Sequence, residues 1–506
     1  MSSPSPTLDP AAPRWYGGWR LPKSPGIMGF DLLSSGVLVG ALVLCIFTLM
    51  LAGFLPTIAV GLISGAVLSL LIKKNAHHES GLQRLLVRLA WRQTRLAGSN
   101  NYRSGPLGKT RRGTYQLPGL LANTKLYEYM DAWGQPFAIV ELPTKGHYSI
   151  SFRVEPEGSS LVDQDQVNIW VGRYAAVLKQ LGDEPGLIAA QITVETAPDT
   201  GSRLRRYVTA RMDANAPEVS KAMLRDVVER YPAGSASVRI WVALTFSSLI
   251  HGKRLPIDEF ASAIKPRLRG LGDQFRGTGV GGARALTAQQ LCELVRIAYN
   301  PSAAAAIEEA NLAGNPVPLH WYDIGPAGAD TFWDCYAHDD ALSITWAMTE
   351  APRGVVKETI LQSLLQPNVE VPRKRVTMLY RILDPATAAK TVDSDVASAQ
   401  TAATATKRPR ASKVRELELA VTTAKEEASG AALTDFALMV TATVDGNDVA
   451  ARQVARATIE ALGQTARLSL RPLYGSQDSA FVGALPIGVA LPEYMAVPRE
   501  IRRLTT

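Results

Sequence analysis

Cysteine is scarce in this sequence, and no complete set of metal ligands can be recognised in it. Only Cys45, Cys292 and Cys335 occur among 506 residues, which excludes a disulfide framework. Cys335 and His338 have a spacing that metal ligands use, but no second pair accompanies them. A structural cysteine is the simpler interpretation, so we expect no metal-ligating residue.

The sequence also lacks a complete motif for nucleotide binding or nucleophilic catalysis. The stretch SGPLGKT at 104–110 ends like a phosphate-binding loop, but the first glycine of that motif should stand where Arg103 does. The glycines at 277–282 fit Gly-x-Gly-x-x-Gly, but no helix starts directly after them. No Gly-x-Ser-x-Gly elbow occurs. We therefore predict no catalytic residue, no cofactor-binding residue, no cofactor and no enzymatic activity.

Charge is absent from two long apolar stretches near the start of the chain, 32–51 and 54–72. Each is long enough to cross the hydrocarbon core of a bilayer as a helix. The short break between them, with Gly53 and Pro56 close by, predicts an antiparallel pair. The predicted fold class is therefore α+β, with a transmembrane helical hairpin at 31–73 after a cytoplasmic segment at 1–30.

Basic residues flank the predicted hairpin on both sides and are absent from its tip. The positive-inside rule then places both termini and the large domain in the cytoplasm. This arrangement predicts a two-pass protein of the inner (plasma) membrane. The net charge of +8 fits contact with an anionic partner, of which a lipid surface and nucleic acid are the usual kinds.

Both apolar stretches contain a Gly-x-x-x-Gly pattern, Gly36 with Gly40 and Gly61 with Gly65. Small residues four apart let helix backbones approach closely. We predict that these four glycines pack membrane helices, either within the hairpin or against another membrane subunit.

A basic amphipathic helix is predicted within the juxtamembrane segment 74–114. Arginines recur at helical spacing over 81–98, with leucines grouped on the other side. Together with the two lysines that precede it, this basic helix favours contact with anionic lipid. Nucleic acid is the weaker alternative, because no aromatic stacking platform accompanies the charges. The predicted lipid-contacting residues are Lys73, Lys74, Arg84, Arg88, Arg92 and Arg95.

The remaining chain alternates short apolar strands with helical patterns. The stretch HYSISFRVEP at 147–156 alternates at period two, a helix is predicted over 162–181, and a strand returns at 187–196. The same order recurs further along, which predicts ferredoxin-like α/β sandwich subdomains in two cytoplasmic domains, 115–300 and 301–506. The pattern repeats but the residues do not, so the sequence leaves an internal duplication open.

Large apolar residues are nearly absent from 385–430, which is rich in alanine, threonine and charge. We predict an exposed arm of two helices that meet at Pro409, within a basic segment at 407–410. Two interpretations stay open for this arm: a solvated excursion and a docking surface.

Seven longer stretches of the sequence are distinctive. They are YGGWRLPKSPGIMGF, NNYRSGPLGK, LVDQDQVNIWVGRYAAVLKQLGDEPGL, ITVETAPDTGSRLRR, YPAGSASVRIWVALTFS, HDDALSITWAMTEAPRGVV and LRPLYGSQDSAFVGALPIGV. Together they resemble a family of actinobacterial membrane proteins linked to conjugation and type IV secretion. The resemblance implies a PrgI-type two-helix membrane subunit fused to a domain like the amino-terminal domain of a conjugation ATPase, without its motor.

The resemblance further implies a non-enzymatic inner-membrane scaffold of a type IV secretion, or conjugative transfer, apparatus. Such a scaffold anchors or docks a separate secretion ATPase within a multi-subunit complex that includes other membrane channel subunits and the lipid bilayer. A membrane core component of a type VII secretion system, similar to EccE-type subunits, is the alternative of the same class. A membrane-bound enzyme with an unrecognised site is the alternative of another class.

Overall fold

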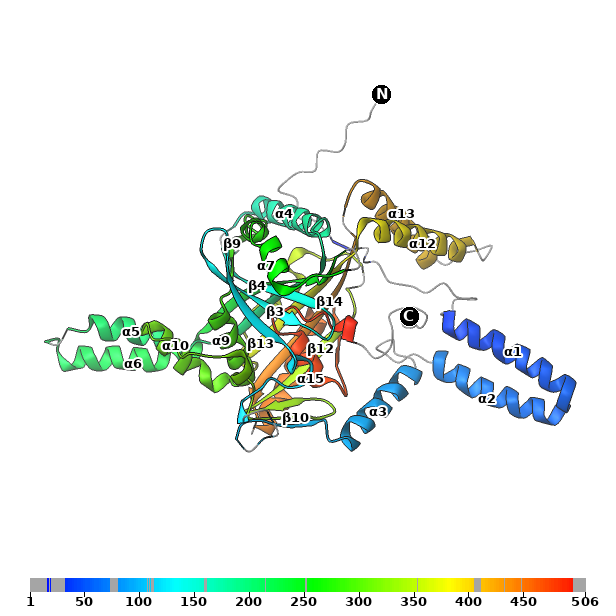
Figure 1. Cartoon of the computed structure of the whole chain (residues 1–506), viewed down its shortest axis with the longest axis horizontal. Coiled ribbons are helices and arrows are strands. Elements are labelled where there is room, and N and C mark those ends of the chain that lie inside the picture. The colour runs from blue at the N-terminus through cyan, green and yellow to red at the C-terminus, as the bar shows by residue number, and fades with distance from the viewer. Residues whose placement is uncertain are drawn as a thin grey trace, which may run out of the picture.

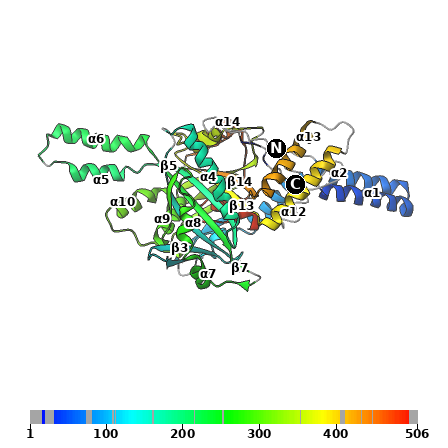
Figure 2. The same ribbon diagram turned by 90° about the horizontal axis from the view of Figure 1, so that it is seen from above.

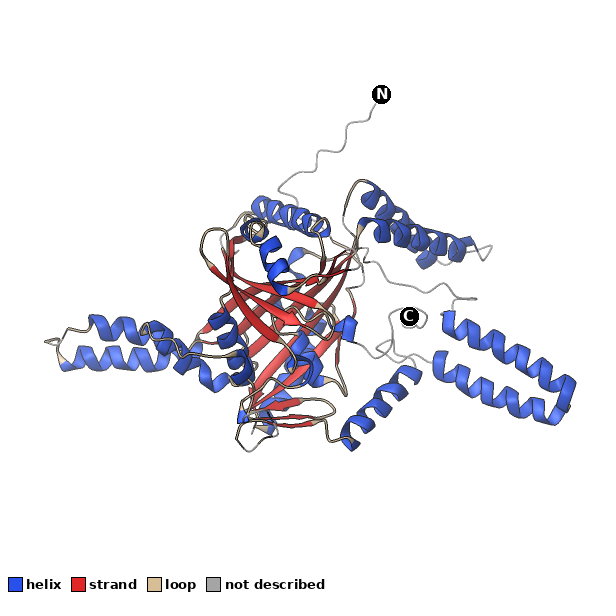
Figure 3. Ribbon diagram, in the orientation of Figure 1, coloured by secondary structure: helices blue, strands red, loops and turns tan. Residues whose placement is uncertain are grey.

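The computed structural model describes most of the chain. The described residues are 16, 17, 19, 32–72 and 81–494, apart from 107, 109, 111, 112, 159–161, 214, 251, 252, 353, 405–410, 432 and 447. The secondary structure of these residues is mixed, with a large sheet in the middle and helices around it and beyond it (Figures 1 and 3). The α+β class expected for the body is therefore found.

The two apolar stretches near the start form a pair of helices, α1 (Leu32–Ala52) and α2 (Phe54–Ile72). Gly53 joins them with a φ of +84°, a conformation that glycine adopts without strain. Within the described part of the chain, however, no helix is long and apolar enough to cross a membrane. The predicted transmembrane hairpin is therefore wrong, and so is the two-pass location in the plasma membrane.

One antiparallel sheet organises the body. Among the described residues it has 13 strands, in the order β1-β10-β11-β12-β14-β13-β5-β6-β4-β3-β2, while β15 pairs with β12 and β9 with β4. The strands of its first half are β2 (Lys125–Met130), β3 (Pro136–Leu142), β4 (His147–Pro156), β5 (Leu187–Pro198), β6 (Ala236–Ser247) and β9 (Val280–Ala285). Those of its second half are β10 (Gly328–Thr331), β11 (Tyr336–His338), β12 (Ala341–Glu350), β13 (Arg373–Ile382), β14 (Thr434–Asp445) and β15 (Ser469–Pro472), with β1 (Asn101–Arg103) at the edge.

The two halves of the sheet have the same topology. In the first, the neighbours run β9-β4-β6-β5, and in the second they run β15-β12-β14-β13. With chain order taken into account, each is the 4-1-3-2 arrangement of a ferredoxin-like unit. The halves are joined by the antiparallel pairing of β5 with β13, so they form one sheet and not the separate sandwiches that the sequence predicts.

The two halves also agree in which residues face each other on paired strands. Ser149 lies opposite Thr245 in the first half, and Ser343 lies opposite Thr443 in the second. The Leu286 N–H donates to the Ser151 carbonyl at 2.8 Å, and the Leu473 N–H donates to the Thr345 carbonyl at 3.0 Å. These equivalent pairings show an internal duplication that the sequence leaves open. The repeats are residues 125–299 and 328–483, so the predicted domain boundary at 300/301 lies between them.

Helices cover the two faces of the sheet unequally. On one face, apolar side chains that alternate along the strands pack against helices of their own repeat. These helices are α4 (Gln164–Gly182), α7 (Ile257–Ile264) and α8 (Leu268–Asp273) in the first repeat, and α11 (Gln362–Leu365) and α14 (Val449–Thr465) in the second. The period-two alternation over 147–156 places Tyr148, Ile150 and Phe152 in this layer.

The opposite face of the sheet meets one helix from each repeat, α9 (Ala288–Tyr299) and α15 (Gln477–Gly483). Both contribute to a shared apolar core, in which Tyr299 and Phe481 pack with ring centroids 5.1 Å apart. Thr287 fixes the start of α9, because its side chain accepts from the Gln290 N–H and the Gln290 side chain accepts from the Thr287 N–H.

A helical arm interrupts each ferredoxin-like unit at the same point, between β5 and β6 in the first and between β13 and β14 in the second. The first arm is α5 (Ser202–Arg211) with α6 (Glu218–Gly234), and the second is α12 (Pro385–Thr404) with α13 (Ala411–Ala428). The two predicted helices of the second arm are thus found, while its basic segment 407–410 lies outside the described residues. Because β5 and β13 are antiparallel, the arms leave the sheet at opposite ends (Figures 1 and 2). The helices α3 (Gly81–Leu96) and α10 (Ala304–Leu312) complete the fold.

Candidate functional site: a buried polar face and two surface arms

Hydroxyl side chains line the sheet face that meets α9 and α15. On each strand they alternate with the apolar residues of the opposite face, as a pleated strand requires. All of them are buried. A buried hydroxyl needs a hydrogen-bond partner. The segment that packs on this face must therefore supply polar groups. The residues are Ser149, Ser151, Thr245, Ser343, Thr345 and Thr443.

The segment that covers the polar face is residues 477–489, here called the C-terminal strap. After α15 it continues as irregular backbone that is nonetheless buried, and its carbonyl groups therefore need donors. The sheet supplies them at 2.7–3.2 Å, with each donor coming from a strand side chain. Thr377 Oγ1 donates to the Ala484 carbonyl, Gln191 Nε2 to those of Gly483 and Leu485, Ser151 Oγ to that of Pro486, and Thr245 Oγ1 to that of Gly488.

These donors come from both repeats, so the strap fastens the two halves of the sheet together. Thr193 and Thr377 lie opposite each other on β5 and β13, where the repeats meet, with hydroxyl oxygens 3.3 Å apart. At the start of the strap, Gln477 accepts from the Thr345 N–H and donates to the Thr345 carbonyl, as a neighbouring strand would.

Substituting Thr377 by valine tests how much the hydroxyl contacts of the strap contribute. The change keeps the shape of the side chain but leaves the buried Ala484 carbonyl without this donor. We expect the free energy of unfolding to fall by about 1–3 kcal/mol, measured by urea denaturation. Thr465→Val, at an exposed helical position, is the matched control and should change it by about 0.5 kcal/mol or less. Equal effects from the two substitutions would contradict a fastening role for the strap.

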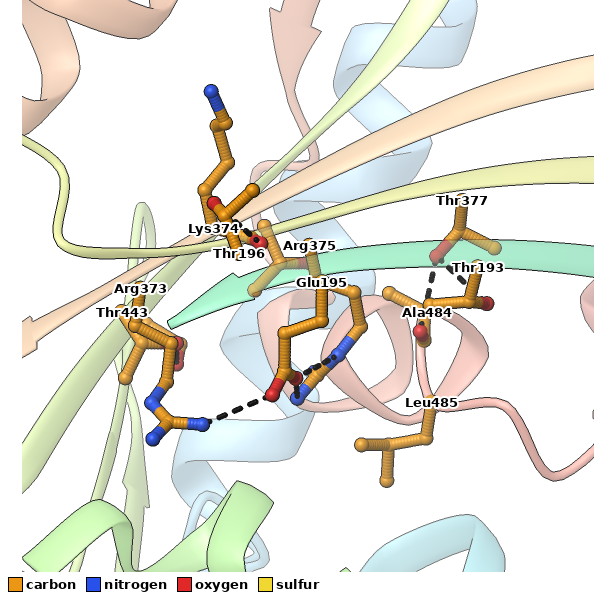
Figure 4. Close-up of polar contacts among 12 residues, drawn as sticks. Thr193, Glu195, Thr196, Arg373, Lys374, Arg375, Thr377, Thr443, Ala484 and Leu485 are labelled. Atoms are coloured by element: carbon orange, nitrogen blue, oxygen red, sulfur yellow. Dashed lines mark hydrogen bonds and ion pairs between the residues drawn. The ribbon is translucent and has the colours of Figure 1, made fainter. Parts of the chain in front are cut away.

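A buried ion-pair cluster lies beside the strap, also across β5 and β13 (Figure 4). Glu195 accepts from Arg373 Nη1 at 3.0 Å and from Arg375 Nη2 at 2.6 Å. Burial alone would raise the pKa of Glu195, but the nearby charges of Arg375 and Arg373 outweigh it and hold the pKa below its usual range. The Arg375 guanidinium also lies 5.8 Å from the ring centroid of Phe481 in α15. The cluster therefore joins the two repeats and α15.

Lys374 points to the opposite side of β13 from Arg373 and Arg375 (Figure 4). Its Nζ donates to the Gln366 carbonyl at 2.7 Å, and burial lowers its pKa to about 8. A lysine with a lowered pKa could act as a base or nucleophile in a suitable site. Here the amine is held by a backbone carbonyl, so its position is structural.

His338 and Ser343 form a contact that resembles a catalytic dyad. Ser343 Oγ is 2.8 Å from His338 Nε2, and His338 Nδ1 is 2.6 Å from the Tyr299 carbonyl. Both side chains are 1% exposed, and burial lowers the pKa of His338 to about 4. No substrate can reach them in this arrangement, so the pair serves packing. The neighbouring Asp339 side chain is also largely buried, and it accepts from the Ala327 N–H at 2.7 Å.

A surface hollow of about 740 Å³ lies at the base of the second arm, lined mainly by residues 182–188 and 381–384. Three of its charged side chains have partners within the protein. Glu184 pairs with Arg267 at 2.6 Å, Arg381 pairs with Asp435 at 2.6 Å, and Asp384 accepts from the Thr387 N–H at the start of α12.

The four glycines predicted to pack helices lie on α1 and α2. A Cβ atom built at Gly36, Gly40, Gly61 or Gly65 would meet no described atom within 4 Å. The packing role of these glycines stays a prediction, because the described atoms show no close helix contact through them. Many apolar side chains of α1 and α2 are exposed, including Met50 at 81% and Leu55 at 82%.

The predicted basic residues separate into two groups. Lys73 and Lys74 lie outside the described residues. Arg84, Arg88, Arg92 and Arg95 all lie exposed on α3, which has the expected amphipathic character. A third face of α3 packs on the body, where Trp91 lies 6.1 Å from the ring of Trp333. Lipid contact by these residues stays a prediction.

The first arm is the surface feature that sequence reasoning missed. Along α6, Val219, Met223 and Val227 are 72%, 66% and 49% exposed, and on α5 Tyr207 is 58% exposed. A signal was present in the sequence: α5 reads SRLRRYVTAR, with four arginines and no acid. The buried cluster around Glu195 was missed as well, because about 180 residues separate its partners in the sequence.

Part of the chain is similar to a known protein family. Residues 23–83 match a family model described as "Domain of unknown function (DUF8461)". No curated protein matches the chain. The segment that contains α1 and α2 is thus similar to a family whose description states no activity.

Proposed function

We propose that this chain is a non-enzymatic scaffold of a type IV secretion, or conjugative transfer, apparatus and that it docks a separate secretion ATPase. The type of apparatus rests on the resemblance of the longer sequence stretches. The docking role rests on the fold, in which one continuous sheet holds two helical arms at opposite ends.

The arms are the observation that carries the proposal. A helix pair inserted between two paired strands adds surface far from the core, and its geometry is fixed by the sheet. In the first arm that surface includes exposed apolar side chains, which are typical of protein-protein contacts. The unusual polar groups of the body, by contrast, hold the repeats and the strap together.

Affinity purification of the tagged full-length protein from its native host, followed by mass spectrometry, tests this function. We expect a VirB-like ATPase and other conjugation subunits to be recovered in proportion to the tagged chain. Recovery of type VII secretion subunits in their place would overturn the assignment to type IV secretion. Purification without any secretion subunit would overturn the scaffold itself.

A further inference from the structure

The two arms occupy equivalent positions in the duplicated fold, so the placement of their apolar side chains can be compared directly. The second arm has an apolar cluster at its base, made of Leu383, Ala388, Val392 and Leu433, with Ala424 against it. The first arm presents its larger apolar side chains outward. A helix pair inserted at this point of the fold therefore does not need an exposed apolar face. The exposed apolar face of the first arm needs another explanation.

The exposed apolar side chains of α6 follow helical spacing. Val219, Met223 and Val227 are four residues apart, which places them along one face of the helix. Apolar residues with this spacing form the face through which one amphipathic helix contacts another. Methionine suits such a surface, because its flexible side chain adapts to the partner.

The charge of the first arm indicates the sign of the partner. Residues 202–234 contain seven basic and four acidic residues, and α5 contributes four arginines without an acid. Arg203 pairs with Glu308 at 3.4 Å, and the Arg211 guanidinium lies 3.9 Å from the ring of Tyr207. Arg205 and Arg206 are exposed and form no ion pair within the described part of the chain.

We infer that the first arm binds an acidic, amphipathic helix of a partner protein. The apolar stripe of α6 receives the apolar side of that helix, and the arginines of α5 attract its carboxylates. Nucleic acid fits this surface less well. The row of exposed valine and methionine side chains suits the apolar side of a helix and offers no hydrogen-bond donor to phosphates. The inference rests on the proposed docking function and names its surface.

A defined peptide tests the inference without knowledge of the natural partner. The probe is a fluorescent peptide of about 20 residues, with leucine at helical spacing and glutamate at the other positions. Two molecules serve for comparison: the same peptide with lysine in place of each glutamate, and a single-stranded DNA oligonucleotide. Fluorescence anisotropy measures binding to the full-length chain. We expect the glutamate peptide to bind most tightly, and its binding to weaken as salt rises from about 0.05 to about 0.5 M.

Two variants of the arm separate its apolar and charged contributions. Met223→Asp/Val227→Asp and Arg205→Glu/Arg206→Glu should each weaken binding of the glutamate peptide by about tenfold or more. Val369→Asp/Val454→Asp, at exposed valines outside both arms, is the matched control and should leave binding unchanged. Circular dichroism checks that each variant is folded.

Several results would overturn the inference: no binding of the glutamate peptide, equal binding by all variants, or preference for the lysine peptide or DNA. Its failure is distinguishable from failure of the proposed function. If the host ATPase still co-purifies with the arm variants, the scaffold function stands and the arm is not its surface. If the peptide binds as expected but no secretion subunit co-purifies, the arm is a docking surface in another kind of assembly.

Discussion

Replacing Glu195 by alanine should destabilise the protein by about 3–5 kcal/mol. The change leaves Arg373 and Arg375 buried without their shared carboxylate, and an uncompensated buried charge is costly. Urea denaturation at pH 7 measures the effect. Glu218→Ala is the control, because Glu218 also forms an ion pair, with Lys221 at 3.0 Å, but its side chain is 77% exposed. That control should change the free energy of unfolding by about 0.5 kcal/mol or less.

The effect of Glu195→Ala should depend on pH. The pKa of Glu195 in the folded protein is lowered from an ordinary value of 4.5. A carboxyl group of this kind contributes stability above its unfolded pKa and loses it as the pH falls through the folded pKa. The difference between wild type and variant should therefore be complete at neutral pH and shrink as acid is added below the ordinary pKa. A difference that is constant with pH, or equal to that of the control, would contradict the assignment of an ionised carboxylate.

Gly488→Ala should be the second strongly destabilising substitution, with a loss of about 2–4 kcal/mol. Gly488 has a φ of +72° in the strap, and a Cβ there would overlap Ser149 Oγ and Thr245 Oγ1. The left-handed conformation disfavours alanine by about 1 kcal/mol, and overpacking of a buried position adds about 1–3 kcal/mol. Urea denaturation measures the loss.

Gly314→Ala separates these two contributions. Gly314 has a φ of +78°, but a Cβ there would meet nothing within 4 Å. Its substitution should therefore show the conformational cost alone, about 1 kcal/mol. If the two alanine variants were equally stable, the strap would not be packed on the polar face as described.

Sequence patterns predicted the local structure well where one rule dominates. The alternation over 147–156 gave a strand with one apolar and one polar face, and the uncharged stretches over 32–51 and 54–72 gave α1 and α2. The transmembrane hairpin did not follow from those helices: in the part of the chain that the structure describes, no helix is long and apolar enough to cross a membrane. Helix formation and membrane crossing are separate inferences.

Features that depend on pairing between distant strands could not be predicted. Nothing near Glu195 in the sequence indicates that Arg375 lies opposite it, since that register is set by the joining of the two repeats. The strap was missed for a similar reason. Its residues read as an ordinary apolar tail, and the donors that satisfy its backbone come from four different strands. The first arm was missed because an exposed apolar stripe reads in sequence like the buried stripe of any amphipathic helix.

The most direct test of the docking account is a quantitative comparison of complexes from the native host. The tagged full-length chain, its Met223→Asp/Val227→Asp variant and the Val369→Asp/Val454→Asp control are purified side by side, and the secretion ATPase is quantified relative to each tagged chain. The account predicts recovery of the ATPase with the wild type and the control, and a loss of about tenfold or more with the arm variant. Equal recovery with all three chains, or no ATPase with any of them, would contradict it.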